Sequence, residues 1–200
     1  MASETGTKSK RARRRDPHRI WYDFRGLAFA PAVVFIALCP FGECERHGII
    51  FPLSGAMFLA GFALRVWCQM HLRYRLDVRK VLTTTGPYSY VRNPIYIGNT
   101  LMLLGACFLS EVLWFAPILL VWCVLVYRRV VKYEEAHLLK KYGEPYATYV
   151  RAVPRWLPSF GRAAPPLSNA GRFFVSSVLI EAPLLLYVVP FVIKDYVLSS

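Results

Sequence analysis

The chain has 200 residues, of which 56% are hydrophobic, and a formal net charge of +13 at pH 7. This length suggests one domain, and so apolar a composition is unusual for an ordinary soluble domain. The basic residues alternate with apolar blocks instead of forming one stripe, so we expect a basic membrane protein and no nucleic acid partner.

The N-terminal segment, residues 1–19, carries seven Lys and Arg residues and is predicted to be a basic cytosolic tail. The apolar run after it is long and lacks an obvious small-residue cleavage site, which argues against a secretory signal. A bilayer core about 30 Å thick needs about 20 helical residues. We therefore expect two transmembrane helices within residues 20–72, one ending near residue 41 and one over residues 49–72.

Two shorter apolar blocks follow at residues 95–109 and 112–127, with only two residues between them. We expect them to form a tight helical hairpin of barely spanning length. The second helix of this hairpin is predicted to continue beyond the membrane through residue 142. Gly143 suits the position after a helix, and Pro145 cannot continue one.

The C-terminal part consists of a predicted linker over residues 161–172 and a predicted transmembrane helix within residues 173–200. Glu181 lies near the middle of this last apolar block, where an ionisable side chain is a functional candidate by default. It could be protonated, or paired with a group such as Arg65. The sequence thus predicts an all-α, polytopic integral membrane protein with about five transmembrane helices. Four spans and a re-entrant hairpin are the alternative.

The distribution of charge predicts the topology. Residues 1–19, 73–92 and 128–172 carry seven, five and nine Lys and Arg residues, whereas residues 43–47 carry one Arg and the turn at residue 110 carries none. The positive-inside rule places the N-terminus and the three basic segments in the cytoplasm. With five spans the C-terminus lies outside, and any polar site built from the basic segments faces the cytoplasm.

Two polar segments interrupt the apolar blocks, one at residues 85–96 and one at residues 132–146. The first is rich in Gly, Pro and Tyr, and its Asn93 and Pro94 suit the N-cap and the first position of a helix. A membrane protein with both segments on one face could hold a polar cofactor there, beside a lipophilic substrate.

Two adjacent carboxylates stand in the second polar segment. Glu134 shares a helix face with apolar Val130 and Leu138, so it needs a partner, which a bound ligand could supply. Glu135 follows Lys132 by three residues and can pair with it. The two carboxylates are therefore expected to differ in role.

Both polar segments carry short motifs in a fixed order. The motif residues are Gly86-Pro87-Tyr88, Arg92-Asn93-Pro94-Ile95-Tyr96-Ile97-Gly98, Glu134-Glu135, Tyr142-Gly143-Glu144-Pro145-Tyr146, Tyr149, Val153-Pro154-Arg155 and Leu157-Pro158. This pattern resembles the isoprenylcysteine carboxyl methyltransferase family, and membrane phospholipid methyltransferases are similar. The resemblance covers about residues 72–160. It marks residues 73–160 as the methyltransferase core.

The resemblance implies that S-adenosylmethionine binds in a pocket on the cytosolic side and that a lipophilic acceptor enters from the bilayer. The residues implied to bind the cofactor are Lys80, Leu82, Thr83, Tyr88, Asn93, Pro94, Tyr96 and Glu134. The residues implied to act in catalysis are Arg92, Arg129 and Glu134. No metal is expected.

Three positions depart from the family pattern. The eukaryotic members have His where this chain has Lys80 and Asn93. An Asn side chain can still donate and accept hydrogen bonds, but it cannot titrate as imidazole does. The family also places a substrate-side Arg where this chain has Val130, with Arg128 and Arg129 one or two residues away.

The sequence therefore predicts an S-adenosylmethionine-dependent membrane methyltransferase. Carboxyl methylation of an isoprenylcysteine-type lipid is the leading activity, and N-methylation of a phospholipid or S-methylation of a small thiol are alternatives. An NADPH-dependent sterol-type membrane reductase is a remoter alternative. A non-catalytic transporter or scaffold is a third class, and the lack of an internal inverted repeat argues against a transporter.

Overall fold

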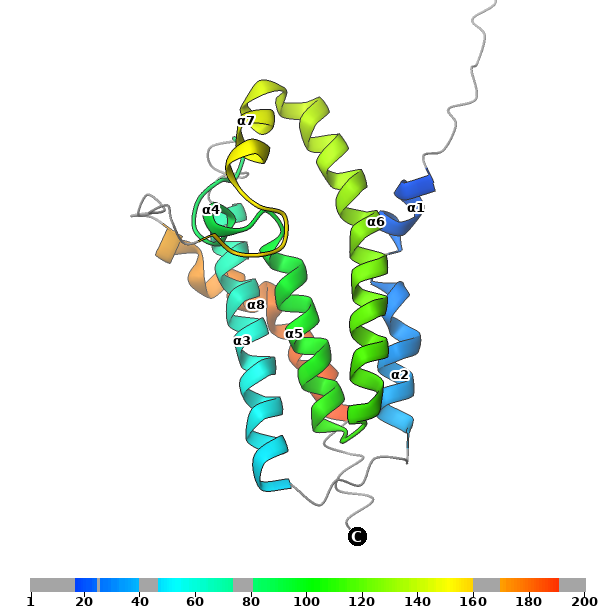
Figure 1. Cartoon of the computed structure of the whole chain (residues 1–200). Helices are drawn as coiled ribbons and strands as arrows, with labels where there is room; N and C mark the ends of the chain where they lie inside the picture. The colour runs from blue at the N-terminus through cyan, green and yellow to red at the C-terminus, as the bar shows by residue number, and fades with distance from the viewer. Residues whose placement is uncertain (1–16, 25, 40–46, 74–80, 160–169, 191–200) are drawn as a thin grey trace, which may run out of the picture.

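The computed structural model describes residues 17–24, 26–39, 47–73, 81–159 and 170–190, and every regular element within them is a helix. In chain order the elements are α1 Pro17–Asp23, η1 Leu27–Phe29, α2 Ala30–Leu38, α3 His47–Arg73, α4 Pro87–Tyr90, α5 Pro94–Leu109, η3 Leu113–Phe115, α6 Ala116–Tyr142, α7 Glu144–Ala152, η4 Ala170–Phe173, α8 Phe174–Glu181 and η5 Ala182–Val188 (Figure 1). The predicted all-α class is therefore confirmed. Most of the predicted basic tail and linker lies outside the described residues.

Two helices in the described ranges are long and apolar enough to cross a membrane, over Gly48–Arg73 and Leu113–Tyr142. Only 22% and 33% of their most apolar windows are buried inside the protein, so most of this apolar surface faces outward, as expected of helices in contact with lipid. The apolar helices over Leu27–Leu38 and Pro94–Leu109 are shorter than the roughly 17 residues that a span needs. The structure therefore does not confirm the predicted count of five spans.

The last apolar block does not form one regular helix. The helix α8 ends at Glu181, and the chain continues as the 3₁₀ segment η5 from Ala182. Pro183 accounts for the change, because proline has no backbone N–H and its ring crowds the carbonyl four residues earlier. The element predicted as a single helix within residues 173–200 therefore changes type at residue 182.

The predicted hairpin between α5 and α6 is present. The helix α5 ends at Leu109, and Glu111 takes a positive φ of 60° in the turn that follows. The helix α6 then runs unbroken to Tyr142, and Gly143 follows it with φ 61°, as the sequence predicts.

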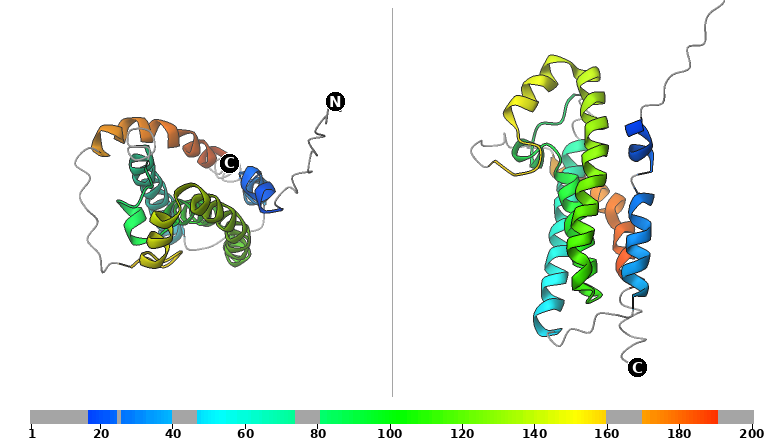
Figure 2. Two further views of the ribbon diagram at one scale, coloured as in Figure 1. Left: turned by 90° about the horizontal axis from the view of Figure 1, so that it is seen from above. Right: turned by 45° about the vertical axis from the view of Figure 1, so that its right-hand side comes forward.

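The helix α6 is long enough to carry its acidic residues beyond a bilayer core. At about 1.5 Å per residue, its 27 residues span about 40 Å, about 10 Å more than a bilayer core. Glu134 lies about 27 Å along the helix from Ala116, a distance close to the thickness of a bilayer core of about 30 Å. Beyond Tyr142, α7 folds back over α4, so that the two polar segments lie side by side (Figures 1 and 2).

The helices α3 and α5 approach so closely that only glycine fits between them. A Cβ atom on Gly61 would lie 2.6 Å from the carbonyl oxygen of Gly98. A Cβ atom on Gly105 would lie 2.8 Å from the backbone nitrogen of Phe58. Small residues of this kind let helix backbones touch in a membrane, where the hydrophobic effect does not drive helix association.

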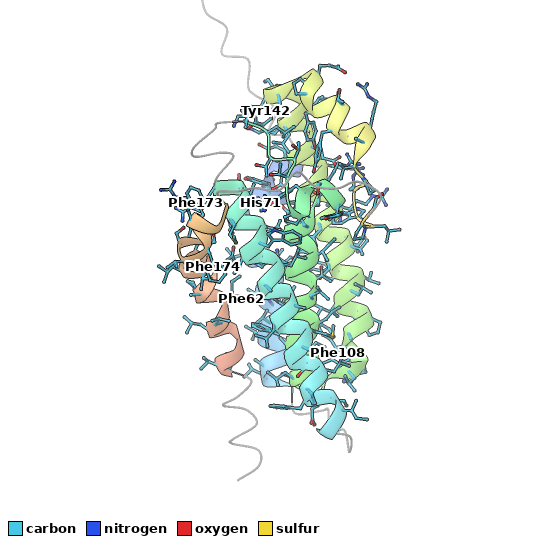
Figure 3. All side chains as sticks on the ribbon, turned by 90° about the vertical axis from the view of Figure 1, so that its left-hand side faces the viewer. Phe62, His71, Phe108, Tyr142, Phe173 and Phe174 are labelled. Atoms are coloured by element: carbon cyan, nitrogen blue, oxygen red, sulfur yellow. The ribbon has the colours of Figure 1, made fainter. Side chains whose placement is uncertain are left out.

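The turn before α5 rests on the end of α3. His71, in the last turn of α3, accepts a hydrogen bond on Nε2 from Trp67 over 3.1 Å (Figure 3). The proton of the neutral ring is therefore on Nδ1, which lies 3.1 Å from the Thr85 hydroxyl. Gly86 covers the ring with φ 61°, and a Cβ atom there would lie 2.3 Å from Nε2. The site that follows in the chain is thereby fixed to α3.

We expect Gly86→Ala to destabilise the protein more than Gly143→Ala. Both glycines have φ 61°, so either substitution introduces backbone strain of about 1–3 kcal/mol. Only the Cβ atom at Gly86 also meets His71, whereas no described atom lies within 4 Å at Gly143. The melting temperatures of the two variants in detergent measure the difference. Equal decreases would contradict the proposed packing of the turn on His71.

Candidate active site

The centre of the candidate site is a hydrogen bond between the first turn of α5 and the acidic part of α6. The Tyr96 hydroxyl donates to Oε1 of Glu134 over 2.7 Å. Tyr96 is 4% exposed, and its ring packs against Tyr127 with centroids 4.7 Å apart. Tyr127 precedes Glu134 by seven residues, about two turns, so both project from one face of α6. Two residues that the sequence assigns to one cofactor site are therefore in direct contact.

Glu135 joins three segments of the chain. Its Oε1 accepts a hydrogen bond from Nε of Arg155 over 3.0 Å and lies 3.1 Å from Nη1 of Arg92. Its Oε2 accepts from Nη2 of Arg155. The side chains of Glu135 and Arg92 are only 15% and 11% exposed, so water screens this pair weakly. The sequence suggests Lys132 as the partner of Glu135, and the structure shows two arginines instead.

Backbone groups hold the two polar segments together as well. The Arg92 N–H donates to the Pro154 carbonyl over 2.9 Å, and the Ser159 N–H donates to the Tyr90 carbonyl over 3.0 Å. The Tyr149 hydroxyl donates to the carbonyl of Tyr88 over 2.7 Å. The segment after α7 therefore lies alongside the turn before α5, and the convergence predicted from the motifs is present.

Asn93 differs from its predicted role. The helix α5 begins at Pro94 as expected, but the Asn93 side chain does not cap it. Its Nδ2 group instead donates to the Arg155 carbonyl over 3.3 Å. A tertiary contact takes the place of the local one, and it adds a further link between the two polar segments.

Three other predicted site residues, Leu82, Arg129 and Lys80, have different outcomes. Leu82 packs with Tyr146, Tyr149 and Val153 under α7. Arg129 lies elsewhere: its guanidinium stands 5.0 Å from the centre of the Trp21 ring, on the side of α1. Lys80 lies outside the described residues. The structure thus joins the turn, α6 and α7, and does not bring Arg129 to them.

Two buried polar groups of the candidate site lack a hydrogen-bond partner within the described residues. Thr83 is 7% exposed, and its hydroxyl has no hydrogen-bond partner among the described residues. The same holds for Nε of Arg92, although Nη1 of this side chain is ion-paired with Glu135. Buried polar groups are rarely left without partners, and a polar ligand is one way to supply them. The chemistry of these two groups is therefore compatible with a polar cofactor, whereas the structure does not confirm the predicted cofactor pocket.

Burial keeps the phenols of the site neutral. It raises the pKa of Tyr146 to about 12, with a smaller contribution from the nearby Glu135 carboxylate. Burial also raises the pKa of Tyr88 and of Tyr149 well above the usual value for tyrosine. These hydroxyls consequently donate hydrogen bonds at neutral pH and do not serve as bases.

Sequence reasoning does not assign roles to two residues of the site. Arg155 stands 20 residues after Glu135, and only the reversal of the chain at Gly143 brings the two together. Tyr127 could be found from the sequence, because its spacing from Glu134 is that of one helix face.

The comparisons with known proteins agree with this geometry. Residues 53–145 match the family described as phospholipid methyltransferase. The chain is 31% identical over 123 residues to the cobalt-zinc-cadmium resistance protein CzcN of Cupriavidus metallidurans, covering 59% of this chain and 56% of that protein. It is 33% identical over 94 residues to the nickel-cobalt-cadmium resistance protein NccN of Alcaligenes xylosoxydans xylosoxydans, covering 47% and 43%.

A third relative is the protein-S-isoprenylcysteine O-methyltransferase of Schizosaccharomyces pombe, 37% identical over 84 residues, which cover 39% of this chain and 33% of that protein. The matches therefore span between a third and just over half of the relatives. No solved structure matches the chain significantly. The family match confirms the resemblance drawn from the motifs, and it includes Tyr96, Glu134 and Glu135 but ends before Arg155.

Replacing Glu135 by Gln is expected to lower the free energy of unfolding by about 2 kcal/mol, because hydrogen bonds to charged groups contribute about 1.5–3 kcal/mol. The matched control is Glu144→Gln, which removes a pair with Arg151 whose side chains are 74% and 68% exposed. Such exposed pairs contribute about 0–1 kcal/mol. Unfolding of both variants by SDS titration checks this, and equal stabilities would show that Glu135 does not hold the segments together.

Proposed function

We propose that the chain is an integral membrane methyltransferase that uses S-adenosylmethionine, because residues 53–145 match the phospholipid methyltransferase family. The observation that supports the proposal is the Tyr96–Glu134 hydrogen bond, which joins the two family motifs. The activity, the substrate and the cofactor of the whole protein are parts of this proposal.

The cofactor is proposed to bind where the turn, α6 and α7 meet. Its sulfonium is cationic, and the Glu134 carboxylate with the neighbouring Tyr88 and Tyr96 rings suits a positive charge. The unpartnered Thr83 hydroxyl could accept or donate a hydrogen bond to its polar groups. The remaining residues proposed for this site are Lys80, Leu82, Asn93 and Pro94, and those proposed to act in catalysis are Arg92 and Glu134. Arg129 is not proposed to act there, because its guanidinium lies against Trp21 instead.

When bound, the cofactor supplies an electrophilic methyl group whose bond to sulfur breaks as its bond to the acceptor forms. The task of the chain is to align the acceptor with that methyl group and to exclude water. Within the site, Glu135 forms ion pairs with Arg92 and Arg155, and these pairs fix the turn before α5 against α6. We propose that the site faces the cytoplasm, as the distribution of Lys and Arg predicts.

A carboxylate is the acceptor that this site supports best. Amine and thiol acceptors must lose a proton, whereas a carboxylate is already ionised at neutral pH. The buried phenols of Tyr88 and Tyr146 keep their protons under these conditions, so neither supplies a base. The fission yeast relative is named as an O-methyltransferase. We therefore propose carboxyl methylation of an isoprenylcysteine-type lipid as the leading activity.

The proposed cofactor is tested by ligand-dependent stability of the detergent-solubilised protein. S-adenosylhomocysteine at about 100 times its dissociation constant should add about 2.7 kcal/mol of stability, and NADPH should add none. Glu134→Gln should reduce this gain more than Glu135→Gln, because only Glu134 is placed beside the cofactor. Stabilisation by NADPH alone would favour the reductase, and equal losses in the two variants would contradict the role of Glu134.

The acceptor atom is tested by methyl transfer from the labelled cofactor into a total lipid extract. A methyl ester is hydrolysed by alkali and releases its label as volatile methanol, whereas N-methyl and S-methyl groups do not. We expect alkali to release most of the label. Label that stays with the lipid after alkali would instead support N-methylation of a phospholipid.

A further inference from the structure

An apolar cavity of about 390 Å³ lies among α2, α3, α5, α6 and η5. This volume falls within the range of about 300–1,000 Å³ that is usual for small-molecule sites. Its apolar wall includes Phe29, Val33, Phe58, Met102, Leu103 and Leu184. The polar groups in its lining belong to Arg65, Asn99 and Tyr127. The cavity therefore suits a molecule with an apolar chain and one polar end.

The positive charge in this cavity comes from Arg65, whose guanidinium is held by Glu181 and Asn99. Nε of Arg65 donates to Oε2 of Glu181 over 2.7 Å, and Nε2 of Gln69 donates to Oε1 of Glu181 over 2.9 Å. Nη1 of Arg65 donates to Oδ1 of Asn99. The predicted pairing of Glu181 with Arg65 is thus confirmed, and it offsets the cost of placing a charge at membrane depth.

The two partners are not equally accessible. The side chain of Glu181 is 1% exposed and does not line the cavity, whereas that of Arg65 is 14% exposed and does. A guanidinium has five N–H groups, and the contacts described use Nε and Nη1, which leaves Nη2 for a ligand. A molecule in the cavity therefore lies beside Arg65, whereas the compensating carboxylate of Glu181 is outside the lining.

This polar end adjoins the candidate active site. Asn99 follows Tyr96 by three residues on α5, about one helical turn. Tyr127 lines the cavity and packs against Tyr96, whose hydroxyl contacts Glu134. A headgroup on Arg65 would consequently lie on the membrane side of the Tyr96–Glu134 pair.

We propose that Arg65, positioned by Glu181 and Asn99, binds the anionic headgroup of a single-chain lipophilic acid whose chain fills this cavity. The inference rests on the proposed function, and it assigns carboxylate recognition to α3. It thereby replaces the arginine that the family pattern would put at Val130. Methylation makes the headgroup neutral, so the product loses its attraction to Arg65 and is released more easily.

A second cavity of about 630 Å³ lies between α5 and α6 on another side of Tyr127, and it is the alternative place for the acceptor. Its cations are Arg128, which is exposed, and Arg155, which is already paired with Glu135. The first cavity presents a shielded guanidinium with a free edge, and for that reason we assign the acid to it.

The test compares binding of S-farnesylcysteine, N-acetylated at its amine, with binding of its methyl ester to the full chain in nanodiscs. For the unmodified protein we expect the acid to bind at least tenfold more tightly than the ester. Glu181→Gln removes the competing carboxylate and should strengthen binding of the acid. The double variant Arg65→Gln, Glu181→Gln leaves no buried charge unpaired and should bind acid and ester equally. A structural ion pair would not produce these opposite effects.

A variant at Val33 keeps the test valid if changes to the ion pair impair folding. Val33→Trp fills part of the cavity from α2 and leaves the Arg65–Glu181 pair unaltered in sequence, and it should weaken binding of acid and ester alike by tenfold or more. Unchanged binding in Val33→Trp, or a retained acid preference in the double variant, would overturn the assignment. Stabilisation by S-adenosylhomocysteine is measured on the same samples. If S-adenosylhomocysteine does not stabilise the unmodified protein, the proposed function is refuted. That outcome is separate from the test of Arg65, because binding of the acid does not depend on the cofactor.

Discussion

The contact between the backbones of α3 and α5 determines where the site lies. Gly61, Gly98 and Gly105 let the two helices touch, and the ends of these helices then have fixed positions relative to one another. The turn between them must pass over His71, where only glycine fits, before α5 can begin at Pro94. Tyr96 therefore reaches α6 at a height that packing within the membrane has already set.

Adjacent carboxylates on α6 have different surroundings and hence different roles. Glu135 lies between two guanidinium groups and connects the turn before α5 with the segment after α7. Glu134 receives the Tyr96 hydroxyl and faces the place proposed for the cofactor. The apolar helices show a similar division of roles. Glu181 neutralises Arg65 through an ion pair, and Arg65 is the member of this pair that lines the cavity. In both places one member of a pair or neighbouring couple has a structural role, while the other is the one proposed to meet a ligand.

Much of this arrangement can be predicted from the sequence, because local signals decide it. Gly143 and Pro145 mark the end of α6, and the spacing of the motifs predicts that the turn and the acidic helix meet. The remaining features depend on contacts between distant segments, which compete with the local signals in the sequence. Local rules make Asn93 an N-cap, but the Arg155 carbonyl takes its side chain. The lengths of α2 and α8 also depart from the hydropathy pattern, since an apolar run does not report where a helix stops or becomes 3₁₀.

Because α6 is one unbroken helix, an inserted residue changes both the height of Glu134 along the helix and the direction in which it points. This limits the insertions that the chain can accept. One inserted residue between Tyr127 and Glu134 would turn the acidic face by about 100° and raise it by about 1.5 Å, so the face would no longer meet Tyr96. An insertion of a whole turn would keep the direction but lift the carboxylates by about 5 Å, out of reach of α5. Length changes are therefore better tolerated beyond Tyr142, where α6 has ended, provided that Tyr149 and Arg155 still reach Tyr88 and Glu135.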